Sequence, residues 1–524
     1  MSEQSSTATT PAASRAAGAA GAGRRIPENV RNVLVIMTDQ HRVDTIGCLG
    51  SDCASTPNLD LLGEEGFAFT HAFTPTAICT PARASLLTGK HPITHQVLAN
   101  PEWNIAYSTA LDPSAWTYTQ ALRDNGYNVG LVGKYHVGPN LPDRFGMDDD
   151  SFWGAENPVG NEEYVAWLEE NGHPPVRAHD VWRGTLPGDR PGHLLAARLQ
   201  HGEEATFERF LADRAIARMR EYAADWKHSG KPFSLDVHFF GPHLPYFLPD
   251  EWFDLIDPED ITLPASFGDS LVGKPPVQQN YATYWSTSSF TPQQWKKLIA
   301  IYRGYVAMID FEIGRILDAA RELGLLEDTA VLFTADHGEF TGAHRMNDKG
   351  PAMYDDIYNV PFIAKIPGVS TVGRSDAFVS LLDLPATVME IAGIDAGDEL
   401  DGRSIVDLTR GEEVPNWRQD IVCEFHGHHF PLQQRMLRTR DFKLVVSPES
   451  INELYDLRSD PAEMTNVYTA PVYAQIRREL GTELHRQLRE RGDHSFAKWM
   501  SAVMDIEVTL KNTARSDLDE VQAG

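Results

Sequence analysis

Four short runs rich in apolar residues, each followed by charged or imidazole side chains, constrain the fold of this chain most strongly. The runs cover residues 32–37, 126–133, 231–240 and 329–334. Runs of this kind, of which 32–37 is the most continuously apolar, predict strands that are buried on both faces of a sheet. In open α/β sheets, ligands bind beyond the carboxyl ends of the strands. The polar residues after the four runs are therefore expected to meet at one site.

The residues after the runs have the chemistry of an anion and metal site. Asp39 follows the first run and is placed to hold a metal, although an aspartate that caps the next turn is the alternative. Lys134 and His136 follow the second run on one face, as an oxyanion-binding charge and a group that acts near neutral pH. A solvated lysine and a core histidine are the alternative for that pair. Asp336 and His337 follow the last run and, facing Asp39, predict a divalent metal site.

The stretch Cys79-Thr-Pro-Ala-Arg83 predicts a reactive thiol at the start of a helix. Pro81 suits the first turn, Thr80 can cap it, and Gly89 is placed to end the helix. Cys79 is then expected just ahead of the helix N-terminus, where free N–H groups favour an anion or a thiolate. Arg83 lies four residues on and returns to the same face. A small buried thiol beside a structural arginine is the alternative.

Composition excludes several classes of protein. The 46 Lys and Arg against 74 Asp and Glu give a formal charge of −28, which argues against nucleic acids and anionic membranes as partners. Four cysteines in 524 residues do not make a disulfide scaffold, and they show no Cys-x-x-Cys zinc motif. An anionic substrate would need a local cluster of positive charge.

Neither a membrane span nor a secretion signal is expected. The sequence holds no run of 18 apolar residues. Arg24-Arg25 is followed by Ile-Pro-Glu-Asn, whereas a secretory or twin-arginine signal needs an apolar stretch there. We therefore expect a cytoplasmic protein with a disordered tail over residues 1–27.

The motifs, taken together, resemble the type I, formylglycine-dependent sulfatases of the alkaline phosphatase superfamily. Cys79-x-Pro-x-Arg83 followed by Thr88-Gly89 matches the first signature of that family, and Gly126-Tyr to Gly133-Lys-x-His136 matches the second. Pro242-His243-Leu-Pro-Tyr246 and Asp336-His337 match two further motifs. Val129 replaces the usual Ser or Thr, and Gln40 replaces a usual second Asp. In having Gln40 in place of this Asp, the chain is similar to the branch of the family that resembles phosphonate monoester hydrolases and choline sulfatases.

The resemblance implies a fold and a division of the chain. The expected fold is a large mixed β-sheet sandwiched by helices, with a small C-terminal antiparallel α+β subdomain. We expect a catalytic domain over residues 28–410, a C-terminal subdomain over 411–510 and an acidic tail over 511–524. Helices are expected over 205–226 and 295–323, within and after a substrate-specificity insertion of about 140–230. Short strands at 421–425, 435–438 and 442–446, then helix from about 470 to 500, are expected in the subdomain.

The resemblance also implies roles for the site residues. The catalytic and sulfate-binding set is Cys79, Arg83, Lys134, His136, His243 and Lys349. The metal-binding set is Asp39, Gln40, Cys79, Asp336 and His337. Asn100 and His344 are weaker candidates for substrate contact, and loop hydrogen bonding is the alternative for Asn100. His426, His428 and His429 are interpreted as a solvated loop, and histidines that face the cleft or bind a metal adventitiously are the alternatives.

By the same resemblance, a formylglycine made from Cys79 attacks a sulfate monoester, and the chain is a metal-dependent sulfuric ester hydrolase. Calcium is the usual metal of the family, and a histidine ligand makes Mn²⁺ the alternative. The expected partners are a small anionic ester and a formylglycine-generating enzyme, and a homo-oligomer is allowed. Hydrolysis of phosphonate monoesters or phosphodiesters on the same site is one alternative. An unmodified phosphatase and a non-catalytic anion-binding protein are the others.

Overall fold

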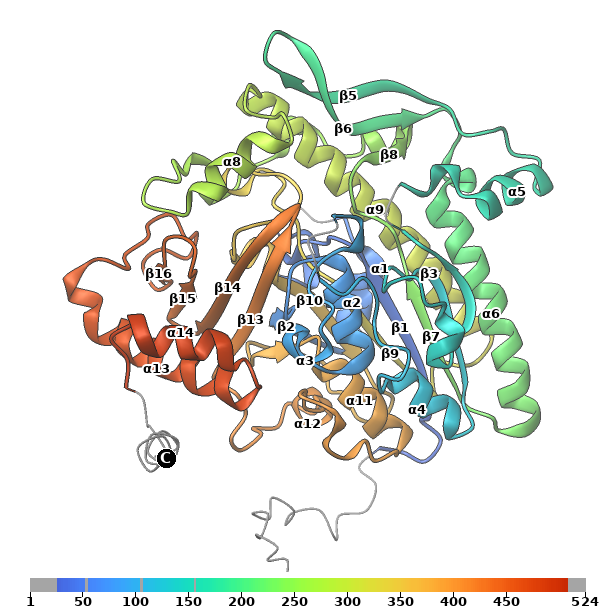
Figure 1. Cartoon of the computed structure of the whole chain (residues 1–524). Coiled ribbons are helices and arrows are strands. Elements are labelled where there is room, and N and C mark those ends of the chain that lie inside the picture. The colour runs from blue at the N-terminus through green and yellow to red at the C-terminus, as the bar shows by residue number, and fades with distance from the viewer. Residues whose placement is uncertain (1–25, 52–54, 104–106, 155–156, 508–524) are drawn as a thin grey trace, which may run out of the picture.

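A nine-stranded mixed sheet forms the centre of the protein (Figure 1). The computed structural model describes residues 26–51, 55–103, 107–154 and 157–507. The strands follow the order β11-β2-β10-β9-β1-β7-β3-β4, and β12 pairs with β2. Their bounds are β1 Asn32–Thr38, β2 Phe67–Phe73, β3 Asn128–Lys134, β4 Asp148–Phe152, β7 Phe233–His238, β9 Thr329–Ala335, β10 Asn359–Lys365, β11 Gly373–Ser375 and β12 Val379–Ser380.

The four strands predicted from the apolar runs are neighbours and run parallel. β1 pairs with β9 on one side and with β7 on the other, and β7 pairs with β3. Successive side chains of β1 enter two different cores. Leu34 and Ile36 pack into one core, and Val33 and Val35 pack into the other. This two-sided burial explains why the run is continuously apolar.

Helices cover both faces of the main sheet. The core around Leu34 includes residues of α1, α6 and α9, and the core around Val33 includes residues of α2, α4 and α11. In Figure 1, α2, α4 and α11 lie in front of the sheet. The helices of this region are α1 Pro57–Glu65, α2 Cys79–Thr88, α3 Pro92–His95, α4 Tyr118–Asp124, α5 Glu162–Glu170, α6 Phe207–Ser229, α7 Asp250–Phe253, α8 Pro276–Tyr284, α9 Pro292–Glu322, α10 Asp355–Tyr358, α11 Asp383–Ala392 and α12 Val406–Thr409.

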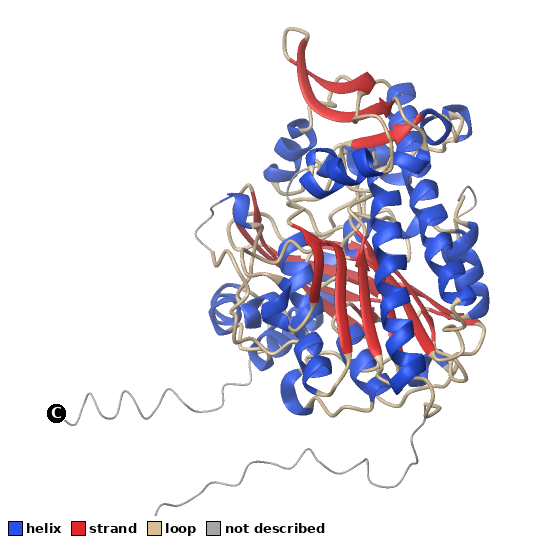
Figure 2. Cartoon of the chain, turned by 90° about the vertical axis from the view of Figure 1, so that its right-hand side faces the viewer, coloured by secondary structure: helices blue, strands red, loops and turns tan. Residues whose placement is uncertain are grey.

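Two smaller sheets accompany the main sheet. The antiparallel C-terminal sheet has the order β13-β14-β15-β16 and packs against α13 and α14. A three-stranded sheet, β5-β6-β8, stands above the main sheet in Figure 2. The remaining bounds are β5 Ala178–Leu186, β6 Arg190–Leu199, β8 Tyr246–Pro249, β13 Asp420–His428, β14 Phe430–Thr439, β15 Phe442–Val446, β16 Glu453–Asp456, α13 Ala474–Glu490 and α14 His494–Val503. The predicted fold class is confirmed.

Several predicted boundaries are wrong, and local contacts explain why. Helix α2 begins at Cys79 itself, because Asn100 Oδ1 accepts the Thr80 N–H at 3.0 Å and replaces the expected Thr80 cap. Helix α6 begins after a Thr206 cap and ends three residues later than predicted, at Ser229 before Gly230. Within 140–230 we predicted one helix, but the structure adds α5 and the β5–β6 hairpin. The hairpin was missed because β5 is almost wholly solvent-exposed and has no apolar alternation.

The predicted tails lie almost entirely outside the described residues. Ile26, at the end of the predicted N-terminal tail, is buried in the core that contains Val33. Residues 511–524 are outside the described ranges. Among the helices of the described ranges, none combines the length and apolar character needed to cross a bilayer.

Candidate active site

The carboxyl ends of the parallel strands deliver polar side chains to one place. Thr38 of β1 pairs with Ala335 of β9, so the next residues, Asp39 and Asp336, are neighbours. Lys134 is the last residue of β3. The strands were predicted from the sequence, and the register between β1 and β9 sets how far apart Asp39 and Asp336 lie.

Helix α2 brings the thiol and the guanidinium to the same edge. Cys79 is the first residue of the helix, and it is buried with 1% of its surface exposed. Its Sγ lies 3.1 Å from Nε2 of His337 and 3.9 Å from Oδ1 of Asp39. The free N–H groups at this helix end add positive potential beside the sulfur.

Arg83 joins the two strand ends through its guanidinium. Its Nη2 donates to Asp39 Oδ2 at 2.8 Å, and its Nε donates to Asp336 Oδ2 at 2.9 Å. Its Nη1 donates to the backbone oxygen of Lys134 at 2.7 Å. Because one planar group spans three strand ends, a lysine at this position could not make the same contacts.

Four buried side chains form a candidate metal centre. One ligand atom from each of Asp39, Cys79, Asp336 and His337 lies within 4.8 Å of the others. His337 Nδ1 lies 2.9 Å from the backbone oxygen of Gly338, so Nδ1–H donates there and Nε2 faces the cluster. Two carboxylates and one imidazole fit a divalent cation. Asp39 directly follows β1, Asp336 and His337 directly follow β9, and Cys79 is the first residue of α2.

Gln40, the fifth predicted metal ligand, has its amide engaged on both sides. Its carbonyl Oε1 accepts from Lys349 Nζ at 3.0 Å, and its Nε2 donates to Glu339. The backbone N–H of Gln40 donates to Asp336 Oδ1 at 3.1 Å. Gln40 therefore connects the metal cluster to Lys349.

Two lysines supply positive charge next to the thiol. Lys134 Nζ lies 2.7 Å from Asp39 Oδ2 and sits over the Phe240 ring. Lys349 Nζ lies 2.8 Å from Nε2 of His243. Because the chain is acidic overall, an anionic substrate would need local positive charge. Arg83, Lys134 and Lys349 supply it from three separate segments of the chain.

The electrostatics of the buried groups follow from this arrangement. Burial favours the neutral thiol, but the ammonium groups of Lys134 and Lys349 outweigh burial and hold the pKa of Cys79 well below its usual range. Burial and the neighbouring Asp39 carboxylate raise the pKa of Asp336 to about 6. Burial opposes the charged form of His337, yet the Asp336 carboxylate raises its pKa to about 9. The raised pKa values of Asp336 and His337 indicate a negative potential at these two side chains, which favours a bound cation.

His136 has a carboxylate partner that motif matching missed. Its Nε2 lies 2.8 Å from Glu102 Oε1, and its ring packs edge-on against Trp153. Burial favours the neutral acid, and the hydrogen bond to His136 lowers the pKa of Glu102. Glu102 lies in a short 3-10 helix, Pro101–Trp103, 34 residues before His136 in the chain. It belongs to none of the matched motifs, so no pattern in the sequence pointed to it.

The weaker candidates have partners of their own. Asn100 is buried and bonds the first turn of α2, as described above. His344 Nδ1 lies 2.7 Å from Asp269 Oδ2, and its ring stacks on Tyr354 at a centroid distance of 3.7 Å. His238, interpreted as a packed histidine, is buried next to the backbone oxygen of Lys134.

The predicted solvated histidine loop is wrong. His426 and His428 belong to β13 and are buried. His426 Nε2 lies 2.8 Å from Glu424 Oε2, and His428 Nε2 lies 3.8 Å from Asp348 Oδ2. The buried carboxylates of Glu424 and Asp348 are thus the partners of these two imidazoles. The histidine triplet in the sequence gives no indication of either partner.

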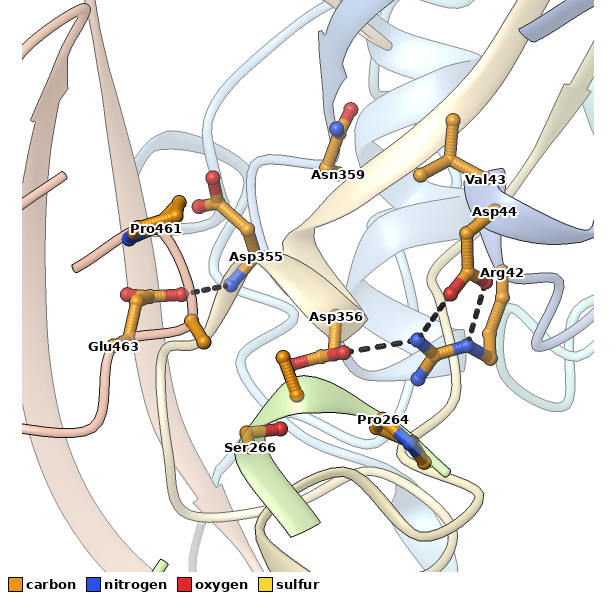
Figure 3. A pocket seen from close by; sticks show the side chains of 12 residues that line it. Arg42, Val43, Asp44, Pro264, Ser266, Asp355, Asp356, Asn359, Pro461 and Glu463 are labelled. Carbon is orange, nitrogen blue, oxygen red and sulfur yellow. Dashed lines mark hydrogen bonds and ion pairs between the residues drawn. The ribbon is translucent and has the colours of Figure 1, made fainter. Parts of the chain in front are cut away.

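A separate cavity of 330 Å³ has the wrong charge for an anionic ester (Figure 3). Asp44, Asp355, Asp356 and Glu463 line it. Arg42 is committed to two of these carboxylates, at 2.7 Å from Asp44 and 3.0 Å from Asp356. The cationic Cys79 cluster is the better site for a sulfate ester.

Comparisons with known proteins agree with this geometry. The family model described as Sulfatase matches residues 31–394, and the model described as N-sulphoglucosamine sulphohydrolase, C-terminal, matches residues 342–490. The uncharacterized sulfatase YidJ of Escherichia coli (strain K12) is 30% identical over 455 residues, which cover 86% of this chain and 85% of YidJ.

Two further proteins resemble the chain, one by sequence and one by fold. An arylsulfatase of Clostridium perfringens is 28% identical, with coverage of 85% of this chain and 91% of the relative. The crystal structure of phosphonate monoester hydrolase of Agrobacterium radiobacter superposes with a TM-score of 0.75 at 27% identity. That comparison covers 88% of this chain and 96% of the hydrolase.

Proposed function

This chain belongs to the sulfatase family of sulfuric ester hydrolases, and we propose that it hydrolyses small sulfate monoesters at the Cys79 centre. The observation that carries the proposal is the convergence of Cys79, Arg83, Lys134, His243 and Lys349 on the carboxyl edge of the sheet. The membership explains why the motifs occur in order along the chain. The geometry supports a site in which positive side chains compensate the negative charge of a bound sulfate group.

Two additions to the chain complete the proposed centre. Asp39, Asp336 and His337, together with the side chain at position 79 and the carbonyl oxygen of Gln40, would hold one divalent cation, with Ca²⁺ proposed and Mn²⁺ as the alternative. Conversion of Cys79 to formylglycine by a formylglycine-generating enzyme would supply a hydrated aldehyde as nucleophile, and the cation would supply Lewis-acid stabilisation. The ammonium groups of Lys134 and Lys349, which lower the pKa of Cys79 against the effect of burial, support an anionic nucleophile at this position.

The protein's own side chains bind and orient the sulfate group. Lys134 and His243 face its non-bridging oxygens, and Lys349 faces the bridging oxygen of the leaving alcohol. Arg83 keeps the Asp39 and Asp336 carboxylates in place. Because these groups are buried, their charges act in a low-dielectric setting.

His136 and Glu102 are proposed to move the proton that restores the centre after the alcohol leaves. The carboxylate of Glu102 orients the imidazole at 2.8 Å, as in other histidine bases. The resemblance implied a catalytic role for His136 alone, and the proposal adds Glu102 as the residue that orients its imidazole.

A paired assay tests the function and its main alternative. We expect the kcat/KM of the wild-type protein for an aryl sulfate to be higher than its kcat/KM for an aryl phosphonate monoester. The similarity to the Agrobacterium radiobacter hydrolase motivates the second substrate. Dominant phosphonate turnover would move the chain to that activity. An unmodified Cys79 in peptides from the native host, with neither substrate hydrolysed, would favour an anion-binding protein.

A further inference from the structure

The ammonium group of Lys349 contacts three polar side chains. Its Nζ donates to Gln40 Oε1 at 3.0 Å and to His243 Nε2 at 2.8 Å, and it forms an ion pair with Asp348 Oδ1 at 3.1 Å. Two of the three N–H donors of the ammonium are therefore used in hydrogen bonds, and the Asp348 carboxylate attracts the group through its charge. Gln40 and Asp348 are buried, whereas His243 is partly exposed. The bond to His243 is therefore the one that an entering substrate can replace.

Asp348 is fixed from its far side by two other elements. The hydroxyl of Tyr281, from α8, lies 2.8 Å from Asp348 Oδ2 and also contacts the backbone oxygen of Lys349, so it can donate its one proton to either oxygen. His428, from β13, places Nε2 at 3.8 Å from the same oxygen. The backbone N–H of Asp348 donates to Glu339. The carboxylate thus has a fixed position before any substrate binds.

The backbone at Asp348 restricts which residues fit there. Its φ of 69° lies in the left-handed region, where aspartate and asparagine are enriched among residues other than glycine. Burial opposes ionisation, but the Lys349 ammonium holds the pKa of Asp348 well below its usual range. The residue is therefore a charged aspartate in a conformation that asparagine can also adopt.

We infer that Asp348 is a positioning residue that aims Lys349 at the leaving oxygen of the ester, with Tyr281 and His428 fixing its carboxylate. This inference rests on the proposed role of Lys349. As the bond between sulfur and the leaving oxygen breaks, its electron pair stays on that oxygen, and an N–H of Lys349 donates to it. The contact matters most for weakly acidic alcohols, which develop the most charge.

A series of aryl sulfates tests the inference, from dinitrophenyl sulfate as the best leaving group to phenyl sulfate as the poorest. For Asp348→Asn we expect kcat on phenyl sulfate to fall roughly 100-fold, because a small misplacement of a catalytic group is costly. On dinitrophenyl sulfate, which needs little help at the leaving oxygen, we expect a loss of about twofold. Tyr281→Phe is expected to steepen the leaving-group dependence in the same direction.

The matched control is Asp310→Asn. Asp310 is another buried aspartate, and it accepts from the backbone N–H groups of Asn58 and Leu59 at 3.1 and 2.8 Å, with no contact to Lys349. This variant should keep the wild-type leaving-group dependence even if it lowers thermal stability. Equal losses across the series in both Asp348→Asn and Tyr281→Phe would overturn the inference. Wild-type protein that releases sulfate from no member would instead refute the proposed function.

Discussion

At the scale of single residues, Arg83 shows why the proposed metal ligands can remain charged without exposure to water. It donates to Oδ2 of Asp39 and to Oδ2 of Asp336, and one ligand atom of each carboxylate lies in the candidate metal cluster. The motif Cys79-x-Pro-x-Arg83 pointed to Arg83 and Cys79 together. Glu102 and Asp348 were not pointed to by any motif, because the contact of Glu102 with His136, and those of Asp348 with Tyr281 and His428, form only in the fold.

Asp336→Asn should remove the metal while leaving the fold intact. The amide keeps the shape of the carboxylate but loses the charge, so bound metal is expected to fall from about one per chain to near zero. The measurement is metal content after gel filtration. Asp310→Asn is the control, since Asp310 is also buried but bonds the backbone N–H of Leu59 at 2.8 Å, at the start of α1. Unchanged metal in Asp336→Asn would remove this ligand assignment.

At the scale of elements, the apolar runs predicted strands well because each is buried on both faces. The same rule could not find β5 and β6, which have exposed faces and a sequence without clear periodicity. Helix ends were predicted where the capping residue is next to the helix in the sequence, as Gly89 is at the end of α2. They were missed where the cap comes from a distant loop, as with Asn100 and α2.

Asn100 variants separate capping of α2 from contact with substrate. Asn100→Ala should lower the free energy of unfolding by about 1 kcal/mol, because the Thr80 N–H loses its acceptor. Asn100→Asp retains an acceptor and should keep most of that stability. Chemical denaturation measures both variants. Full stability in Asn100→Ala would contradict the capping role.

The contact between α6 and α9 predicts a pH dependence of stability. Glu208 of α6 accepts from the Tyr305 hydroxyl of α9, and burial raises the pKa of Glu208 to about 7. Because the folded protein holds this proton more tightly than the unfolded chain, the contribution to stability is full below about pH 4.5 and is lost as pH rises through 7.

Glu208→Gln should therefore make the protein more stable at pH 8 relative to wild type, by up to about 3 kcal/mol. At pH 5 the two proteins should differ much less. Denaturant unfolding at both pH values measures the difference, with exposed Glu170→Gln as the control. An equal effect of Glu208→Gln at both pH values would contradict this account.

At the scale of the whole molecule, the C-terminal sheet shares a core with the catalytic region. Phe73, Ile78 and Met353 pack in one cluster with Cys423 and Met436. Resemblance to a family predicted this sheet, but its contribution of His428 next to Asp348 depends on three-dimensional packing that no motif records. The division at residue 410 remains a prediction.

The formal charge of −28 predicts how salt acts on the whole enzyme. Long-range repulsion slows the approach of an anionic substrate, while the buried cations are less affected by salt. Raising the concentration of sodium chloride from low to physiological values should raise kcat/KM by about twofold or more. A neutral phenyl ester, if hydrolysed, serves as the uncharged control. A fall in kcat/KM for the sulfate would contradict the prediction.

The most direct test of the central claim is sulfate release by the wild-type protein and by Cys79→Ala, each with and without a chelator. The account predicts release by the wild type, loss of release in Cys79→Ala, and loss of wild-type release after chelation. Both proteins should show the same thermal unfolding, since removal of one buried thiol leaves the strands and α2 in place. Sulfate release by Cys79→Ala at the wild-type rate, or release unaffected by the chelator, would contradict a metal-dependent reaction at Cys79.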